Sequence, residues 1–493
     1  MAIMHHECSQ AKILALCIKA LHLQTKKAHF CSIVQTMRLE MLLITFLSVS
    51  SAPLVLSAAL GPRQSSDNTA TVDLAVNRGT PEHLASGIIY GIPDTPNQIP
   101  DSFYTDVGFN YARAGGAQLP APSRGWIWGL NEYQGRFEST FSNYETTRKY
   151  GGTFILLPHD LWGTDSTNSS TVWPGDNGDF SDYDAFLDKV IDDIKINNMI
   201  EGLVWDIWNE PDLSVFWQRD SSQWISLYVR THERLSAQPT QTNSWWTDWL
   251  SAVQMNNVIP DQYSWHIEGN INDPIDDLGT NNSTLTEMLC NYGLPARQAN
   301  INEYATFAEQ VASGAAWWIS RLERYDTIGL RGNWLSSSAL HDFMASLLGK
   351  PNADNSDYDP RGTGYYPNGE YQVYKYYNQD MTGSRAATTG SGDRLMDVFA
   401  TIGTDKIRVL AGTRLQQGTW FITVKGLTTV GLPESGSVVI HTLGFVDAGH
   451  YGEVSGSSDR GDILHTYSGD TLTFPVYQTA EDQFTAWAFE ISL

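Results

Sequence analysis

The stretch Val204-Trp205-Asp206-Ile207-Trp208-Asn209-Glu210-Pro211-Asp212 joins an apolar run to an acidic turn. Its first residues predict a buried β-strand. Pro211 has no backbone N–H and cannot continue a sheet ladder, so we expect Glu210 to lie at the C-terminal end of that strand. An acidic turn that simply closes a strand is the alternative, but it does not explain an Asn-Glu pair beside two tryptophans. We therefore interpret Glu210 as a functional carboxyl group.

Short apolar runs alternate with longer helical stretches on both sides of this strand, from about residue 87 to residue 383. The predicted strands are Ile88–Gly91, Tyr111–Ala114, Thr153–Leu157, Gly202–Ile207, Tyr263–Ile267, Gln298–Asn302 and Gly329–Trp334. The predicted helices are Asp182–Ile196, Trp224–Ser236, Trp245–Met255, Ala308–Arg324 and Glu370–Met381. This alternation indicates a parallel sheet covered by helices, and the α/β fold that we expect is a closed (β/α)8 TIM barrel. A doubly wound open sheet is the alternative, but no glycine-rich phosphate loop follows the first strand.

The predicted barrel lacks one strand. The fifth strand should lie between the helix that ends near Ala237 and the helix that begins near Trp245, where only Gln238–Ser244 is available. So short a segment, without an apolar run, cannot supply two loops and a buried strand. Either the helix boundaries differ from these, or an exon is missing. In the second case we expect a gap between the fourth and sixth strands of the barrel.

The pattern changes after the barrel, and residues 384–493 are predicted to form an all-β sandwich. Short runs rich in Val, Ile, Thr and aromatic residues are separated there by Gly, Asn, Asp and Ser, as in sandwich domains. Residues 60–86 precede the barrel, and Thr71–Ala75 within them is predicted to be a strand that joins the sandwich. We expect this accessory domain to brace the barrel, with glycan binding as the alternative.

The N-terminal part has the pattern of a secretory signal peptide over residues 37–59. Met37-Arg38-Leu39-Glu40 is followed by an apolar core and by Ser57-Ala58-Ala59, small residues that suit cleavage. We predict that the protein is secreted and extracellular, and that residues 1–36 are a gene-model extension. A transmembrane anchor is the alternative, but the apolar run is short and is interrupted by Ser and Pro53. No membrane association is expected after cleavage.

Composition narrows the range of partners. The chain has 55 acidic and 31 basic residues and a formal charge of −24, which repels phosphate backbones, so nucleic acid is not an expected partner. The 17 Trp and 22 Tyr residues suit stacking on sugar faces, although core packing accounts for most of them. Sequons at Asn168, Asn281 and Asn282 fit a secreted glycoprotein. The sequence does not indicate the oligomeric state.

A second predicted strand also ends in a carboxylate, at Glu303 in Gln298-Ala299-Asn300-Ile301-Asn302-Glu303-Tyr304. Taken alone, this carboxylate is equally consistent with a functional group and with an ordinary strand end. Together with Glu210 it is informative, because cleavage of a glycosidic bond needs two carboxyl groups on opposite sides of that bond. One donates a proton to the leaving oxygen, and the other captures or stabilises the oxocarbenium-like centre. We expect both groups at the C-terminal face of the barrel.

These residues give the chain a resemblance to a known group of enzymes. Asn209-Glu210 after a fourth strand and Glu303 after a seventh resemble clan A of the glycoside hydrolases, the 4/7 barrels. The motif Tyr111-Ala112-Arg113-Ala114-Gly115-Gly116 and the following sandwich are similar to family 39, although Ala114-Gly115-Gly116 departs from the phenylalanine- or histidine-rich motif of that family. The resemblance implies that Glu210 is the acid/base and Glu303 the nucleophile, with net retention of configuration.

Other polar side chains are expected to support these two carboxyl groups. Asn209 is expected to hold the substrate's 2-hydroxyl group, whose hydrogen bond strengthens in the transition state. Arg113 is expected to hydrogen-bond Glu303 and keep it ionised, with a structural ion pair at the barrel rim as the alternative. His266 is expected to bind Glu303 or a sugar, with a buried structural histidine as the alternative. An apolar, tryptophan-lined setting is expected to keep Glu210 protonated.

Three further side chains are predicted to bind the sugar. Tyr304 and Trp334 would form an apolar platform, with core packing as the alternative, and His159 would contact a terminal sugar. No cofactor is expected. No metal site is expected either, because the sequence has no Cys/His cluster with ligand spacing, and residues 352–357 lack the glycine and the final Glu of a calcium loop.

The sequence thus predicts a secreted retaining glycoside hydrolase that cleaves plant or microbial polysaccharides or oligosaccharides by double displacement. Exo activity of the β-xylosidase kind is favoured. An endo-acting clan A glucanase or galactanase is one alternative, and a non-catalytic glycan-binding barrel is another. We expect the loop Trp162–Asp179 to close a pocket in an exo-enzyme and to leave an open groove in an endo-enzyme.

Overall fold

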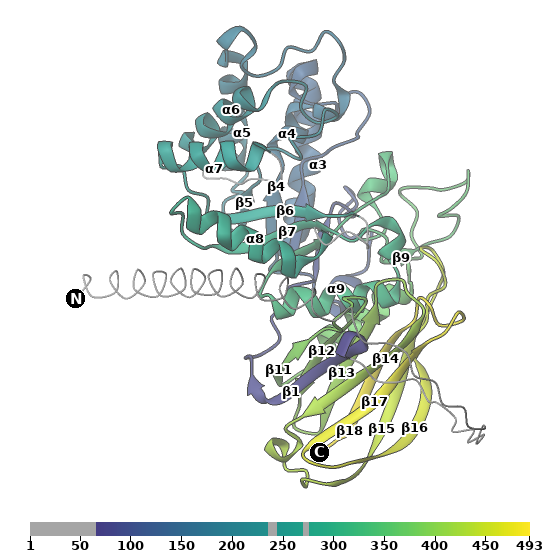
Figure 1. The fold of residues 1–493 in the computed structure, drawn as a ribbon. Coiled ribbons are helices and arrows are strands. Elements are labelled where there is room, and N and C mark those ends of the chain that lie inside the picture. Colours follow the sequence, from purple (N-terminus) through teal and green to yellow (C-terminus); the bar gives the residue numbers. More distant parts are fainter. Residues whose placement is uncertain (1–65, 235–243, 270–275) are drawn as a thin grey trace, which may run out of the picture. The chain divides into compact units, whose positions relative to one another are not determined.

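The computed structural model describes residues 66–234, 244–269 and 276–493. The predicted gene-model extension, the signal peptide and most of the segment proposed to lack a strand therefore lie outside the described residues. The described chain is an α/β barrel followed by a β-sandwich, which confirms the predicted fold class (Figure 1). None of the described helices combines the length and the apolar character needed to cross a bilayer.

The barrel is a parallel sheet with the order β5-β4-β3-β2-β8-β7-β6. Its strands are β2 (Gly87–Ile89), β3 (Tyr111–Ala114), β4 (Thr153–Leu156), β5 (Leu203–Trp205), β6 (Gln262–Ile267), β7 (Gln298–Tyr304) and β8 (Ile328–Arg331). β8 pairs with β2, as the last and first strands of a (β/α)8 barrel do. The sheet therefore curves back to its own first strand on this side.

On the opposite side the described sheet is open between β5 and β6. No ladder joins these two strands in the described residues, and the sheet order ends with them. The helices α6 (Ser221–Arg234) and α7 (Ser244–Asn256) lie between them in sequence and pack against each other. β5 and β6 hold the places of the fourth and sixth barrel strands, so the opening lies where the sequence lacks an apolar run.

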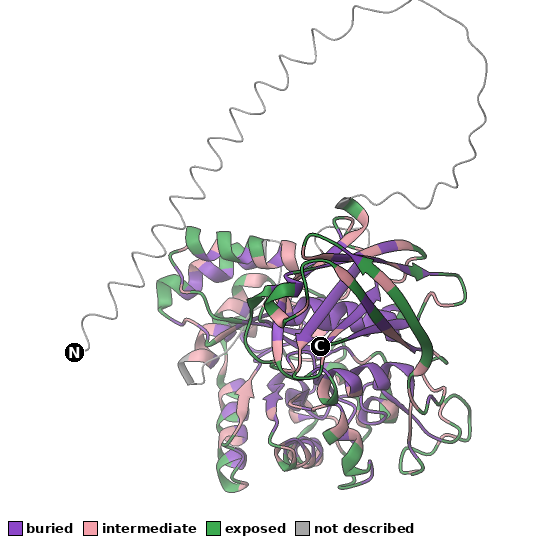
Figure 2. Cartoon of the chain, turned by 90° about the horizontal axis from the view of Figure 1, so that it is seen from below, coloured by how far each residue is buried: buried purple, intermediate pink, exposed green. Residues whose placement is uncertain are grey.

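Helices cover the outside of the barrel. The remaining ones are α2 (Asp101–Asp106), α3 (Leu130–Lys149), α4 (Pro158–Trp162), α5 (Ser181–Ile196), α8 (Leu278–Asn291), α9 (Ala312–Arg324) and α10 (Gly369–Gln379). The long helices α3, α5 and α8 bury one side and leave the other exposed (Figure 2), whereas α4, α9 and α10 are almost entirely buried. The short strands β9 (Leu348–Gly349) and β10 (Tyr366–Pro367) form a separate ribbon.

The sandwich contains strands from both ends of the described chain. Its order is β16-β15-β18-β13-β12-β11-β1-β14-β17. These strands are β1 (Thr69–Asn77), β11 (Ser384–Thr389), β12 (Met396–Ile402), β13 (Lys406–Thr413), β14 (Gly418–Lys425), β15 (Gly436–Phe445), β16 (Ser458–Tyr467), β17 (Thr471–Gln478) and β18 (Ala486–Ser492). β1, which contains the predicted strand Thr71–Ala75, lies antiparallel to β11 and parallel to β14. Val72, Val409 and Phe474 share one buried core.

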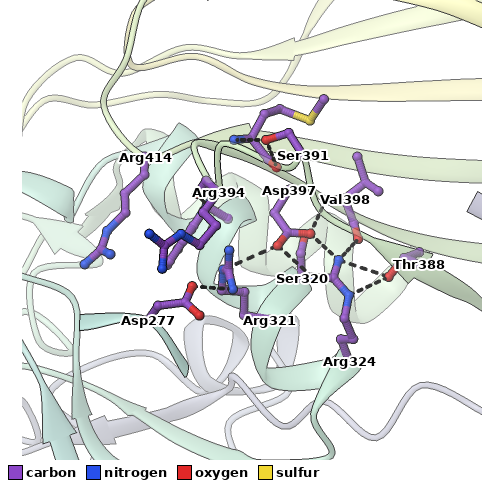
Figure 3. Close-up of polar contacts among 12 residues, drawn as sticks. Asp277, Ser320, Arg321, Arg324, Thr388, Ser391, Arg394, Asp397, Val398 and Arg414 are labelled. Carbon is purple, nitrogen blue, oxygen red and sulfur yellow. Dashed lines mark hydrogen bonds and ion pairs between the residues drawn. The ribbon is translucent and has the colours of Figure 1, made fainter. Parts of the chain in front are cut away.

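The sandwich packs on the barrel through α9, which lies against β12 and β13 (Figure 1). Figure 3 shows the polar contacts that join the two parts. Arg324 of α9 donates through Nη1 to Asp397 Oδ2 at 2.8 Å, and Arg321 Nη1 lies 2.6 Å from Asp277 Oδ2. Arg414 Nη1 donates to the carbonyl oxygen of Asp276 at 2.7 Å. The sandwich therefore holds both the helix α9 and the start of α8.

Candidate active site

The barrel interior begins with an apolar layer. Leu84, Ile155, Ile328 and Leu330 form a buried cluster, with Tyr111 and Val204 packed against it. Side chains two residues apart along a strand point to the same face. The next inward positions on β3 and after β5 are therefore Arg113 and Asp206, and both are almost fully buried. Because the apolar layer seals the lower part of the barrel, these charged groups form the base of a site at the C-terminal end of the strands.

Glu210 follows β5 and has an unusual backbone conformation. Its φ of 37° lies in the left-handed region, where a non-glycine residue costs about 1–3 kcal/mol and is often found at a functional site. Pro211 follows it and further restricts its backbone. The adjoining turn is held by a hydrogen bond from the Leu213 amide to the Glu210 carbonyl, at 2.9 Å. This strained position directs the Glu210 carboxylate toward β6.

A β-bulge in β7 positions the second carboxylate. Trp265 of β6 pairs with Ile301 and His266 with Glu303, so Asn302 is an extra residue in β7. Bulges re-aim side chains and occur near active sites. Here both Asn302 and Glu303 reach groups inside the barrel, because Asn302 Nδ2 donates to Asp206 Oδ2 at 2.7 Å and Glu303 accepts from Arg113.

Arg113 joins the polar residues at the base of the site. Its Nε donates to Asp206 Oδ2 at 2.8 Å, its Nη1 to Glu303 Oε1 at 2.7 Å and its Nη2 to Asn209 Oδ1 at 2.8 Å. Burial alone would lower the pKa of the guanidinium, but the charges of Asp206 and Glu303 outweigh it and raise the pKa. Arg113 is therefore a permanent cation that orients Glu303 and Asn209 together.

His266 lies between the two predicted catalytic carboxylates. Its Nδ1 is 2.9 Å from Glu210 Oε1, and its Nε2 is 3.5 Å from Glu303 Oε1. One imidazole ring therefore spans the distance between the two groups. Burial would lower the pKa of His266, but the charges of Glu303 and Glu210 and the hydrogen bond to Glu210 raise it to about 9. The ring is a cation at neutral pH and donates to Glu210.

The charge on His266 corrects one electrostatic expectation. The sequence predicted that an apolar setting would keep Glu210 protonated, and burial does act to raise its pKa. The charge of His266 and its hydrogen bond outweigh that effect, so the pKa of Glu210 is lowered. The proton is therefore held on His266 Nδ1, in the hydrogen bond to Glu210, and the two groups titrate as a pair.

Glu268 is a third carboxyl group of the site, which the sequence analysis did not single out. Glu210, His266 and Glu268 each place one atom within 4.8 Å of the others, close enough in principle for shared metal ligation. His266 Nδ1 is engaged with Glu210, however, and the ring is protonated, so the cluster as it stands fits a shared proton better than a metal ion. Burial, followed by the charge of Glu303, raises the pKa of Glu268 to about 8.

Two predicted sugar contacts are corrected by the structure. Tyr304 comes directly after Glu303, so its side chain points to the opposite face of β7, where it is 0% exposed and bonds Tyr374 at 2.6 Å. His159 is the second residue of α4 and is only 3% exposed, with its ring against Trp208 and Phe216. Burial, aided by the charge of Arg113, lowers the pKa of His159 to about 3. Both side chains belong to the core.

Trp334 and Asn209 remain available to a ligand. Trp334 follows β8 and is 45% exposed, with its indole nitrogen donating to the Ala305 carbonyl at 3.1 Å. Asn209 Oδ1 accepts a hydrogen bond from Arg113 Nη2. Within the described residues, the Asn209 amide nitrogen makes no hydrogen bond. The structure thus brings Arg113, Asn209, Glu210, His266 and Glu303 together, and Trp334 stands outside that cluster.

Comparison with known proteins identifies the fold. No protein-family model and no curated protein sequence matches the chain. Among solved structures, N2152 from Neocallimastix frontalis is similar with a TM-score of 0.66 and 18% identity, over 86% of this chain and 98% of that one. A monomeric β-xylosidase from Caulobacter crescentus CB15 is similar with a TM-score of 0.55 and 13% identity, over 86% and 99%. The GH39 enzyme from Xanthomonas axonopodis pv. citri has a TM-score of 0.53 and 12% identity, over 88% and 99%.

These similarities extend over almost the whole of each structure, so barrel and sandwich are shared as one architecture. The resemblance to clan A glycoside hydrolases is confirmed at the level of the fold. At such low identities the likeness defines the fold alone. What the chain does must be argued from its own site.

Proposed function

We propose that the protein is a secreted retaining glycoside hydrolase with Glu303 as nucleophile and Glu210 as acid/base. One observation carries the proposal: carboxylates from the fourth and seventh strand positions of the barrel meet the same histidine ring, at 2.9 Å and 3.5 Å. Two carboxyl groups on either side of one bond are what double displacement requires. The similarity in fold to a β-xylosidase and a GH39 enzyme supports the same class.

In the first step Glu303 attacks the anomeric carbon and the bond to the leaving oxygen breaks. Arg113 Nη1 orients the attacking carboxylate at 2.7 Å. The leaving oxygen takes a proton from Glu210, which receives it from His266 Nδ1 through their hydrogen bond. A group that donates a proton in the transition state contributes about 10²–10⁴-fold to the rate. The products of this step are a neutral glycosyl ester, the Glu210 carboxylate and a neutral His266.

In the second step the same pair acts as a base. The ester has removed the negative charge of Glu303, which was one of the two charges that raise the pKa of His266. Water attacks the anomeric carbon on the side of Glu210, which takes its proton and returns it to the imidazole. The C–O bond of the ester breaks and Glu303 leaves as a carboxylate. Two displacements at one carbon give net retention.

The supporting residues fit a neutral sugar bound at this point. The amide nitrogen of Asn209 would donate to the 2-hydroxyl group, while Trp334 would stack on an apolar sugar face. We infer that the substrates are plant or microbial polysaccharides or oligosaccharides, with exo cleavage of the β-xylosidase kind as the first choice. Secretion through residues 37–59 would bring the enzyme to such polymers.

The test is a panel of aryl glycosides assayed with the wild type, Glu210→Gln and Glu303→Gln. We expect Glu303→Gln to lose activity on every substrate that the wild type cleaves. Glu210→Gln should lose far more activity on a nitrophenyl glycoside than on a dinitrophenyl glycoside, because the better leaving group needs no proton. Full turnover by either variant would disprove the assigned roles.

Two further measurements separate the proposal from its alternatives. Proton NMR of the first product should show the configuration of the substrate, and inversion would exclude double displacement. Products from a long oligosaccharide distinguish a terminal sugar, released by an exo-enzyme, from internal fragments, released by an endo-enzyme. If the wild type binds glycans on an array but cleaves none of the panel, the protein is a glycan-binding barrel.

A further inference from the structure

The position of Glu268 is prepared by two strands of the barrel. It follows β6 and stands two residues after His266, so the alternation of a strand directs both side chains toward the barrel mouth. Gly332, just after β8, leaves room for it: a Cβ atom on Gly332 would come within 2.7 Å of Glu268 Oε1. The carboxyl group therefore lies over the end of β8, in the cluster with Glu210 and His266.

Glu268 differs from the other carboxyl groups of the site in its contacts with the described residues. Within the described residues, no hydrogen bond or ion pair engages Glu268, whereas Glu210, Glu303 and Asp206 are all held by His266 or Arg113. Its side chain is only partly buried, and neither of its carboxyl oxygens is among the fully buried atoms without a partner, so both are open to the barrel mouth. The group is therefore placed to accept a partner that enters the barrel mouth.

We propose that Glu268 is a substrate-binding residue, whose uncharged carboxylic acid hydrogen-bonds a hydroxyl group of the sugar held between Glu210 and Glu303. The proposal rests on the proposed glycosidase function and adds to it a specific contact. A protonated carboxyl group offers one donor and one acceptor, which matches a sugar hydroxyl group. An ionised carboxylate could only accept from the hydroxyl group and could not donate to its oxygen.

Burial and the two nearby carboxylates keep Glu268 uncharged. Glu303 and Glu210 oppose its ionisation, while His266 and Arg113 favour it, and burial makes the largest contribution against the charge. Their balance raises the pKa of Glu268 to about 8. The acid is then intact at neutral and acidic pH and is lost as the pH rises through about 8, where we expect kcat/KM to fall.

Three variants test this contact. Glu268→Leu keeps the approximate size of the side chain and removes both hydrogen-bonding atoms. Glu268→Gln keeps a donor and an acceptor but cannot ionise. Gly332→Ala leaves Glu268 unchanged but adds a methyl group that displaces its carboxyl group from the site. Each variant is assayed with a dinitrophenyl and a nitrophenyl glycoside of the best wild-type sugar, between pH 5 and pH 10, after circular dichroism and a melting curve confirm folding.

We expect Glu268→Leu to lower kcat/KM by about 10–100-fold, because a site built for a hydroxyl group loses its partner. The loss should be equal for the two leaving groups, since the contact is to the sugar that remains on the enzyme. Gly332→Ala should show a smaller loss of the same kind. The loss of kcat/KM should be smaller in Glu268→Gln than in Glu268→Leu. In the pH profile of Glu268→Gln, the fall of kcat/KM at alkaline pH should move from about pH 8 toward about pH 9, where His266 loses its proton.

The outcomes distinguish this inference from the function on which it rests. If Glu268→Leu retains wild-type kcat/KM on both substrates, the contact does not exist although the enzyme assignment stands. If its loss is confined to the poorer leaving group, Glu268 acts in proton transfer and the binding role is rejected. An alkaline limb that is the same in Glu268→Gln and the wild type also rejects the proposal. Absence of turnover by the wild type on the whole panel would remove both proposals.

Discussion

Among the buried charged groups of the described residues, one network lies at the barrel mouth and another lies between the barrel and the sandwich. In the second, shown in Figure 3, Arg321 and Arg324 pair with Asp277 and Asp397, and Arg414, also drawn there, pairs with Glu309, so each of these three cations has a carboxylate partner. At the barrel mouth, Arg113 and His266 are the cations. They face four carboxyl groups, those of Asp206, Glu210, Glu268 and Glu303.

The difference separates a structural network from a functional one. At the domain interface each of these charges is paired with an opposite one. An excess of carboxyl groups at the barrel mouth forces protons to be shared and raises the pKa of His266 to about 9 and that of Glu268 to about 8. Within the described residues it also leaves Glu268 without a hydrogen-bond partner. Such perturbed values mark candidate functional sites. Variants at the barrel mouth should therefore lower activity, whereas variants at the domain interface should lower stability and leave activity almost unchanged.

The largest expected effect is that of Arg113→Met. Removal of the guanidinium leaves the buried Asp206 without its cation and releases Glu303 from its orienting hydrogen bond. We expect kcat/KM to fall by about 10²–10³-fold, and the free energy of unfolding to fall by about 3–5 kcal/mol. Steady-state kinetics and urea denaturation measure the two effects. Arg113→Lys, which keeps the charge without the planar fork, is the control, and a loss of activity below tenfold in Arg113→Met would contradict the assignment.

A smaller overall effect is expected for Asp397→Asn at the domain interface. The change leaves Arg324 and Arg321 facing a neutral amide in a buried position, so the free energy of unfolding should fall by about 3 kcal/mol. Because Asp397 lies outside the catalytic site, kcat should change by less than about threefold. A threefold change in kcat corresponds to less than about 1 kcal/mol of activation free energy. Thermal melting and kinetics on one sample test this. Asp206→Asn, the matched change in the other network, should reverse the pattern by reducing activity more than stability.

The smallest effect is expected for Arg78→Ala. Arg78 pairs with Asp326 at 3.0 Å, and the two side chains are 46% and 52% exposed. Exposed pairs contribute about 0–1 kcal/mol, so neither the melting temperature nor kcat/KM should change measurably at physiological salt. A clear loss of activity in this variant would show that the sandwich influences the site by a route other than the buried interface.

Much of the fold could be predicted because the pattern of apolar runs is strong. Strands buried on both faces and helices with one apolar side determine the order of elements in the barrel. The two carboxylates were found for the same reason, since each ends an apolar strand. The position where the described sheet opens was also indicated, because Gln238–Ser244 contains no residues that could line a barrel wall.

The positions of the other site residues depend on local backbone geometry, which the pattern of apolar runs does not show. The extra residue Asn302 in β7 changes which side chains face inward, and alternation beyond it turns Tyr304 toward the helices. The same alternation contained a signal for Glu268, which stands two residues after His266 and ought to share its face. His159 could not be placed because a proline starts a short helix there and turns the ring into the core. The protonation of His266 depends on contacts between strands distant in sequence.

The location of β1 has a consequence for making the protein. Asn68 Nδ2 donates to the carbonyl oxygen of Thr419, 351 residues further along the chain, and the β1 backbone pairs with both β11 and β14. During synthesis β1 leaves the ribosome first and must wait for nearly the whole polypeptide before it can pair, which favours slow folding. A fragment that begins at β11 would expose two unpaired strand edges and be prone to aggregate. An isolated sandwich should therefore be produced as a circular permutant, with residues 69–77 attached after the C-terminus.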